Sequence, residues 1–347
     1  MTPESTILHF DPKNNNSRKA GAPVVAQEHV IVPAAPAELL TDPLMPTIFH
    51  ESWWLDIVTG GNYDYAEVRE NGMPVGRLPY FLRSRWGMKY SIMPPMTHFV
   101  GPAIIEGEGS AATRFLRRAQ ITRELIQQLP KASLYRYKCH HEVKDTIAFQ
   151  QENFITNVQF THEIAPLPHD VLWKNMRSEK RKKIRQAQQQ LTVSFIEDVK
   201  EFWRFYDNNL KKKKIKNVCD ETLCTKLIEV CLVRKRGRIY AARDKNNDVV
   251  AAIFCIWDAH TSFYFMSSRT VIAHNGAISL LAWEAMKDAS SRGQVFDLDG
   301  LNHSSAVLFF TEFGGTVSPR YIVTRQTLVG GLAWALKDMF RENRYFY

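Results

Sequence analysis

The spacing of apolar positions divides most of the chain into amphipathic helices and alternating strands. Residues 111–129 carry apolar side chains at helical spacing, whereas residues 262–268 alternate as strands do. Asn71-Gly72 lies between two extended runs and predicts a hairpin. The sequence predicts helices over 49–58, 111–129, 169–190, 201–210, 221–233, 276–292, 306–310 and 332–340, and strands over 65–68, 75–82, 133–137, 160–164, 193–196, 238–242, 249–257, 262–268, 295–299 and 320–323. This order predicts an α/β fold with mixed sheets.

Residues 262–300 predict a strand, a small-residue loop, a helix and a second strand. Asn275 stands at the expected N-cap, and Gly276 and Ala277 leave the helix start open to an approaching group. A helix start that follows a strand presents backbone N–H groups to a ligand, often an anion. The unit therefore predicts a donor-binding loop. The alternative is that Asn275 is a plain N-cap.

The chain is long enough for two compact units. Residues 1–40 mix Asn, Pro, Ala and Lys without a period, which predicts a disordered or loosely packed leader. Globular units are expected over 41–165 and 166–347, and Pro166 and Pro168 mark the boundary. The beginning lacks the pattern of a secretory signal, and no apolar run reaches the ~18 residues of a membrane helix. We therefore expect a cytoplasmic protein without a membrane span.

The net charge of +9 favours a polyanionic or phosphate-bearing partner. Much of this charge lies in residues 174–185 and 211–216. The second block can attract tRNA or the phosphates of coenzyme A; the alternative is that it binds nothing. Because no RNA-binding module with interleaved aromatic residues is evident, tRNA is the less favoured partner, and no DNA partner is expected.

Cysteine usage gives little sign of disulfides or of a metal. Five cysteines, an odd number, argue against a disulfide framework. Cys139-His140-His141 forms a Cys/His cluster, but no second pair completes four ligands. No metal site is predicted.

Three arginines follow one another at four-residue spacing in the predicted helix 169–190. Arg177, Arg181 and Arg185 lie ~100° round from its apolar stripe. Guanidinium groups in a row can bind phosphates bidentately. The alternative is a solvated helix face.

Two carboxylates alternate on the predicted strand 295–299. Asp297 and Asp299 would share one face, ~6.6 Å apart. A carboxylate at the end of a central strand can deprotonate an attacking amine or hold an ammonium before attack. The alternative is that Asp299 and Gly300 only turn the chain. No Ser-His-Asp or Cys-His arrangement for nucleophilic catalysis is supported. We therefore predict that a group passes directly from donor to acceptor without a covalent enzyme intermediate, with Asp297 and Asp299 as the catalytic candidates.

Three stretches resemble a known superfamily. They are LWKNMRSEKRKKIRQAQQQ (172–190), HNGAISLLAWEAMKDASSRGQVFDLDG (274–300) and AVLFFTEFGG (306–315). With the order of elements, they resemble the GNAT acyltransferase fold and its FemAB-like branch of two tandem GNAT-like units. The resemblance implies an acceptor side in the first unit and a donor side in the second, whose terminal helix could pack back on the first. The candidate donor-binding residues are Arg269, His274, Asn275, Gly276 and Ala277, and the candidate phosphate- or substrate-binding residues are Arg177, Arg181, Arg185, Tyr90, His98 and Glu312.

The chain departs from the family pattern at two positions. Ile272 stands where the usual pyrophosphate loop has Arg or Gln, and Thr311 replaces the lysine of an F-K-x-x-F/Y-G pattern. The prediction is an acyltransferase without a tightly bound cofactor, with acyl-CoA as the preferred co-substrate. Its acceptor would be an amino group of a sugar, amino acid or cell-envelope precursor. The alternatives are an aminoacyl-tRNA-dependent transferase that forms an amide bond and a catalytically inactive binding protein of the same fold.

Overall fold

A computed structural model describes residues 42–85, 87–301 and 304–327. Its helices are η1 (Ile48–His50), α1 (Ser52–Thr59), α2 (Ala111–Gln127), α3 (Ile147–Gln151), α4 (His169–Asn175), α5 (Ser178–Gln188), α6 (Val199–Lys212), α7 (Glu221–Val233), α8 (Ala277–Ser291) and α9 (Ser304–Thr311). None of the helices in these ranges has the length and apolar character needed to cross a bilayer. The predicted leader and the predicted helix 332–340 lie outside the described residues.

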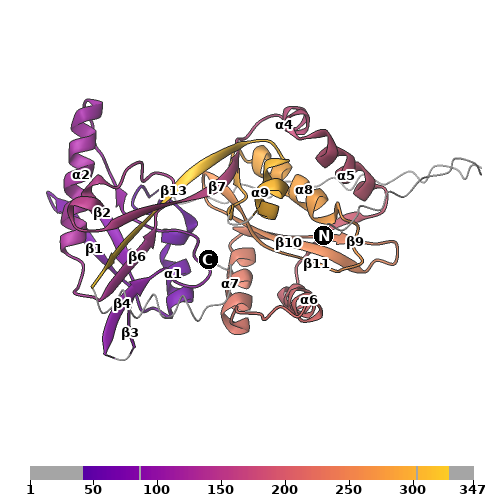
Figure 1. Cartoon of the computed structure of the whole chain (residues 1–347), viewed down its shortest axis with the longest axis horizontal. Coiled ribbons are helices and arrows are strands. Elements are labelled where there is room, and N and C mark those ends of the chain that lie inside the picture. Colours follow the sequence, from indigo (N-terminus) through magenta and orange to yellow (C-terminus); the bar gives the residue numbers. More distant parts are fainter. Residues whose placement is uncertain (1–41, 86, 302–303, 328–347) are drawn as a thin grey trace, which may run out of the picture. The chain divides into compact units, whose positions relative to one another are not determined.

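The strands form one large mixed sheet and a smaller one. They are β1 (Asp64–Glu70), β2 (Met73–Tyr80), β3 (Leu82–Arg85), β4 (Met88–Ile92), β5 (Ala103–Ile104), β6 (Leu134–Lys138), β7 (Ile155–Ile164), β8 (Thr192–Ile196), β9 (Gly237–Arg243), β10 (Val249–Trp257), β11 (Thr261–Arg269), β12 (Val295–Asp297) and β13 (Thr316–Gln326). The large sheet runs β3-β4-β6-β13-β7-β12-β11-β10-β9-β8, and the small one β1-β2-β5 (Figure 1). β11 and β12 are parallel, as are β4 and β6. The predicted mixed α/β fold is confirmed.

Helices cover both faces of strands β9 to β11, which explains their apolar composition. Ile239 and Ala241 belong to a core shared with α6 and α7, whereas Tyr240 and Ala242 face the core of α5 and α8. Figure 1 shows α8 and α9 on one side of these strands and α6 and α7 on the other. Because side chains alternate across a strand, both sets of positions must be apolar.

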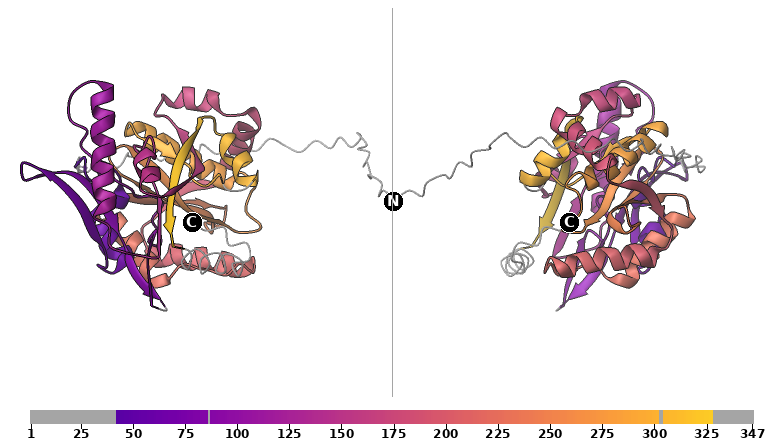
Figure 2. Two further views of the ribbon diagram at one scale, coloured as in Figure 1. Left: turned by 60° about the vertical axis from the view of Figure 1, so that its left-hand side comes forward. Right: turned by 90° about the vertical axis from the view of Figure 1, so that its right-hand side faces the viewer.

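β13 connects the second half of the chain to the first. It pairs with β7 from Thr316 to Thr324 and with β6 from Ile322 to Gln326. Figure 2 shows this strand, in yellow, beside the strands of the first half. One sheet therefore passes through both predicted units, and the division at residue 165 stays a prediction.

The hairpin β1–β2 forms as the sequence predicts. Asn71 and Gly72 both adopt left-handed backbone conformations, with φ of 50° and 80°. Two consecutive residues with positive φ match the twist of the flanking strands, and Asn-Gly is the pair that tolerates them best.

The predicted single helix over 169–190 is wrong, because the chain breaks into α4 and α5. Arg177 is extended, with φ −60° and ψ 144°, and its N–H donates to the carbonyl of Glu312 at 3.0 Å. The guanidinium of Arg181 donates to the carbonyls of Lys174 (2.8 Å) and Met176 (2.7 Å), and so caps the end of α4. The three arginines therefore do not form one helical row.

Candidate active site

The parallel strands β11 and β12 part at the centre of the large sheet. They pair only from Thr261 to Phe263 on β11, opposite Val295 to Asp297. β11 continues to Arg269, and beyond Phe263 its edge toward β12 pairs with no strand in the described ranges. An opening beyond the carboxyl ends of parallel strands is where α/β sheets commonly bind ligands.

Asp299 lies at this opening, but not as the extended residue that the sequence predicts. β12 ends at Asp297, and Asp299 adopts a left-handed conformation with φ 46°. The expectation that both carboxylates share one strand face is therefore wrong. The N–H of Asp299 donates to Oδ1 of Asp297 at 2.8 Å, which supports the unusual backbone.

A lysine and a histidine from the first half of the chain, Lys138 and His98, contact the Asp299 carboxylate. Lys138 Nζ lies 3.3 Å from its Oδ1, and His98 Nδ1 lies 3.1 Å from its Oδ2. Burial would raise the pKa of Asp299, but Lys138 and then His98 outweigh it and hold this pKa well below its usual range. The side chain keeps 21% of its surface exposed. Asp299 is thus an ionised carboxylate that keeps part of its surface exposed.

Asp297 has the opposite environment. Its side chain is 1% exposed, the Thr161 hydroxyl donates to Oδ1, and Arg320 lies 3.3 Å from Oδ2. Arg320 also pairs with Glu163, whose other oxygen accepts from Ser318 at 2.5 Å. Burial raises the pKa of Asp297, against the lowering effect of Arg320. Asp297 therefore holds the end of β12 rather than facing a ligand.

His98 reaches across the opening between the two strands. Its ring stacks between Phe49 (5.3 Å between centroids) and Phe265 of β11 (4.8 Å). Burial lowers the pKa of His98 to about 4, so the imidazole is neutral near pH 7. The structure thus brings together three residues that the sequence proposed: Asp297, Asp299 and His98.

Lys138 was not among the predicted site residues. It ends β6, where Tyr135 and Tyr137 are buried and Lys138 alternates with them. Its place in the sequence, at the end of a strand and directly before Cys139-His140-His141, gives little indication of a functional role. Only the tertiary structure places Lys138 beside Asp299. Tyr90, which was predicted, lies elsewhere: it pairs with Leu134 at the other end of β6.

The start of α8 is covered instead of open. The N-cap is Gly276, not Asn275, and Asn275 is exposed. Gly276 and Ala277 are buried, and a Cβ at Gly276 would lie 2.4 Å from the carbonyl oxygen of Lys183 on α5. His274 Nδ1 accepts from the N–H of Gly276 at 3.0 Å. Glycine is required here because α5 packs directly on the helix start.

Cationic groups lie around this covered helix start. Arg269 is exposed at the end of β11, and its charge adds to burial in lowering the pKa of Lys213, which follows α6. Lys183 lies 4.0 Å from Glu312. Arg185, by contrast, stacks on Trp173 at 5.4 Å. The surface near the β11–α8 loop is therefore positive.

Lys180 forms a sealed charge cluster beneath this surface. Its side chain is 1% exposed, and Nζ contacts Glu312 (3.2 Å), the carbonyl of Phe309 (3.0 Å) and Ser279 Oγ (3.4 Å). The rings of Phe309 and Phe313 also lie against Nζ. Burial lowers the pKa of Lys180 to about 8, although Glu312 opposes the change. The sequence signal was available, since Lys180 continues the four-residue apolar spacing of Leu172 and Met176.

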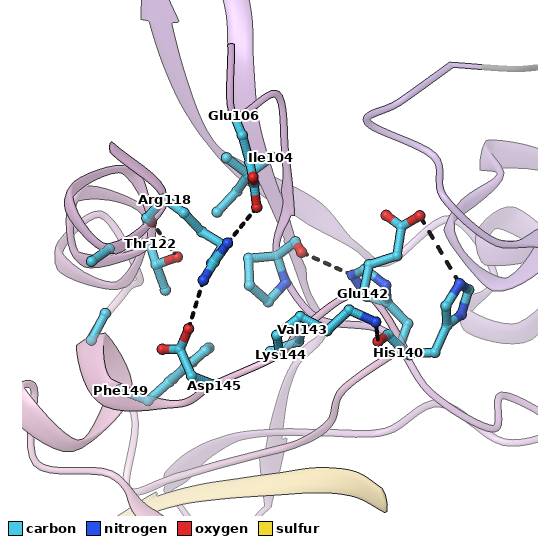
Figure 3. Close-up of a pocket in the computed structure, with 14 residues that line it drawn as sticks. Ile104, Glu106, Arg118, Thr122, His140, Glu142, Val143, Lys144, Asp145 and Phe149 are labelled. Carbon is cyan, nitrogen blue, oxygen red and sulfur yellow. Dashed lines mark hydrogen bonds and ion pairs between the residues drawn. The ribbon is translucent and has the colours of Figure 1, made fainter. Parts of the chain in front are cut away.

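A polar cavity lies in the first half of the chain, between α2 and the loop that follows β6 (Figure 3). Its volume is about 420 Å³. Arg118 bridges Glu106 (2.5 Å) and Asp145 (2.9 Å) on one wall. On the other, His140 Nε2 lies 2.9 Å from the carbonyl of Pro102, and Glu142 lies 4.0 Å from His141.

Metal-binding geometry is not found among the described residues: no group of three or more His, Cys, Asp or Glu side chains is arranged to hold a metal ion. Burial raises the pKa of the Cys139 thiol to about 12, so it stays protonated. His140 contacts a backbone carbonyl instead of converging with Cys139.

Comparisons with known proteins agree with this architecture. Residues 174–302 match the family model described as an acetyltransferase (GNAT) domain. The crystal structure of FemX has a TM-score of 0.59 at 11% identity, over 82% of this chain and 93% of that one. The C-terminal domain of a protein described as a lysylphosphatidylglycerol synthetase from Agrobacterium fabrum has a TM-score of 0.55 at 12% identity, over 82% and 91%. A conserved protein of unknown function from Bacteroides thetaiotaomicron has a TM-score of 0.52 at 12% identity, over 78% and 90%. No curated protein matches the chain by sequence.

These matches confirm the resemblance to GNAT-fold, FemAB-like proteins. They support an acyltransferase as the class of activity. The structural neighbours, at 11–12% identity, show the shared fold alone.

Proposed function

We propose that this chain, which contains a GNAT acetyltransferase domain, transfers an acyl group from acyl-CoA to an amino group of a polar acceptor. The amine nitrogen attacks the thioester carbonyl, a C–N bond forms, and the C–S bond breaks. The thiolate leaves with the electron pair and takes up a proton, while the amine gives up one. No covalent enzyme intermediate is required.

Asp299 is the observation that supports this proposal most directly. Its carboxylate is partly exposed at the opening between β11 and β12, and its backbone is held in a left-handed conformation. Because its pKa is held low, Asp299 is a weak base near pH 7. It is better suited to accept a hydrogen bond from the acceptor amine and to orient it for attack. Asp297 is buried too deeply for either role.

The free edge of β11 favours an acyl-CoA donor. Residues beyond Phe263 present backbone groups toward the opening, where a strand-like ligand can pair with them. The pantetheine arm of coenzyme A contains two amides and can act in this way. At the far end of β11, Arg269 and Lys183 supply positive charge for its phosphates.

The polar cavity of the first half is the proposed acceptor side. His140 and His141 line it, and Lys138, which contacts Asp299, lies only two residues before His140 on the same chain segment. Two residues of extended chain span ~6.6 Å. Charged and hydrogen-bonding groups dominate the lining, so an acceptor bearing amino and hydroxyl groups would fit it better than an apolar one.

An aminoacyl-tRNA donor is the second candidate. The lysine block at residues 211–216 favours it, since a polyanion would be attracted there. Thr311, in place of the lysine of the FemAB-like pattern, argues against it. A catalytically inactive binding protein of the same fold is the third candidate, and the covered start of α8 is the feature that favours it.

A donor screen read by mass spectrometry tests these candidates. The protein is incubated with a pool of acyl-CoAs or of charged tRNAs, together with amino sugars and amino acids. We expect acylated amine from acyl-CoA, strongly reduced in Asp299→Asn and unchanged in Asp248→Asn, a matched control on the exposed β9–β10 turn. Transfer from charged tRNA alone would favour the second candidate. Absence of transfer and of CoA binding in the unmodified protein would overturn the proposal.

A further inference from the structure

Two neighbouring loops expose several aliphatic side chains to solvent. Ile215 and Val218, after α6, are 44% and 45% exposed, and Val271 and Ile272, after β11, are 71% and 85% exposed. Singly exposed apolar residues are ordinary, but several gathered on adjacent loops indicate an interaction surface.

Packing places these loops near each other. α6 packs on β11, and the two loops follow the carboxyl ends of these elements. Arg269, the last residue of β11, is close enough to Lys213 to lower its pKa, after the larger effect of burial. We call residues 213–218 with 269–272 the basic apolar patch.

Lysines surround the aliphatic residues of this patch. Lys212, Lys213, Lys214 and Lys216 are exposed, and none forms an ion pair with an acidic side chain in the described ranges. Lys211 differs, because it pairs with Asp207 at 2.6 Å. Unpaired lysines beside exposed aliphatic groups combine long-range attraction to an anion with apolar area to bury.

We propose that the basic apolar patch docks the protein on an anionic membrane surface. Ile215, Val218, Val271 and Ile272 would insert among the lipid headgroups, and the lysines would lie at the level of the lipid phosphates. Nucleic acid is the less suitable polyanion: single-stranded RNA is bound by stacking on aromatic rings, and residues 213–218 and 269–272 contain no Phe, Tyr or Trp.

Vesicle co-sedimentation tests this proposal without any catalytic readout. The full chain is mixed with vesicles of phosphatidylcholine alone, or of phosphatidylcholine with phosphatidylglycerol. We expect binding to the anionic vesicles at least ~10-fold stronger than to the neutral ones, and weakened by salt. The double variant Val271→Ser/Ile272→Ser should lower vesicle affinity by about 10-fold. Lys212→Gln/Lys214→Gln/Lys216→Gln should lower it by a similar factor or more.

Matched controls separate docking from general stickiness. Leu116→Ser removes a side chain that is 66% exposed on α2, in the first half of the chain, and should leave vesicle binding unchanged. If the unmodified protein does not bind anionic vesicles, or if Val271→Ser/Ile272→Ser binds as well as it does, the proposal is overturned. Binding of RNA that depends on the lysines but not on Val271 and Ile272, without vesicle binding, would identify a nucleic-acid surface and also overturn it.

Discussion

Asp299 and Lys180 are both charged groups in low-exposure sites, yet their surroundings differ in kind. Asp299 has 21% of its side chain exposed at the opening between β11 and β12, on a left-handed backbone. Lys180 has 1% exposed and is enclosed by Phe309 and Phe313. A charge at an opening can meet a ligand, whereas an enclosed charge can only hold neighbouring elements together. Low exposure of a charged group is therefore not by itself a sign of function.

The balance of forces on the two groups is also opposite. At Asp299, Lys138 and His98 outweigh burial, so the charged form is favoured and folding gains from it. At Lys180, burial outweighs Glu312, so the charged form is disfavoured. The groups around Asp299 therefore stabilise its charged form, whereas burial destabilises the charged form of Lys180. Four measurements follow from this difference.

The largest expected effect is the loss of stability in Asp297→Ala. This change leaves Thr161, Arg320 and the N–H of Asp299 without their shared acceptor. Removing one partner of a buried charge network costs about 4 kcal/mol of unfolding free energy. Urea unfolding measures it, with Asp248→Ala as the exposed control. A loss below about 1 kcal/mol would show that Asp297 does not support the end of β12.

Glu312→Gln should lower the unfolding free energy by about 3 kcal/mol at neutral pH, because Lys180 keeps a buried charge without its carboxylate. Adding Lys180→Met should recover at least half of the loss, since it removes the uncompensated charge and methionine suits the site between two phenylalanine rings. Glu108→Gln, at an exposed position, serves as the control. If the double variant is less stable than Glu312→Gln alone, Lys180 contributes through contacts other than its charge.

Asp299→Asn should lower turnover and also cost some stability, because Lys138 and His98 lose their anionic partner. Asparagine tolerates the left-handed conformation, so the backbone is kept while the charge is removed. Turnover should fall about 10²-fold, equivalent to about 2.7 kcal/mol, because the amine loses its orienting acceptor. Transfer rates and thermal unfolding are measured on the same preparation. An unchanged rate would remove Asp299 from the proposed mechanism.

The spacing of apolar residues predicts the helices and strands that bury a regular set of side chains. The meander β9–β11 and helix α7 were predicted closely because each buries a regular set of apolar positions. The break between α4 and α5 was missed, since it depends on a hydrogen bond from Arg177 to the distant carbonyl of Glu312. The apolar spacing continues through Met176 and gives no sign of it.

The candidate site shows the same limit. Asp297 and Asp299 could be selected from a strand pattern, but which of them a ligand can reach depends on the left-handed turn at Asp299. Lys138 and His98 come from the other half of the chain, and no spacing rule relates them to Asp299. Gly276 was expected to leave space for a ligand, but the backbone of Lys183 on α5 occupies that space. These contacts arise only when distant segments pack.

The smallest expected effect is the contribution of Lys180 to the pH dependence of the unfolding free energy. Its folded pKa of about 8 lies below the unfolded value, so its charge destabilises the fold at neutral pH, and this cost is relieved as pH rises above about 8. Buried cysteines such as Cys255 oppose the trend, because they ionise more readily when unfolded. The useful quantity is therefore the difference in unfolding free energy between the unmodified protein and Lys180→Met, in which the shared groups cancel. Between about pH 7 and about pH 9.5 this difference should move in favour of the unmodified protein by roughly 2 kcal/mol. A difference that stays constant over this range would mean that Lys180 keeps its ordinary pKa, and the contrast with Asp299 would fail.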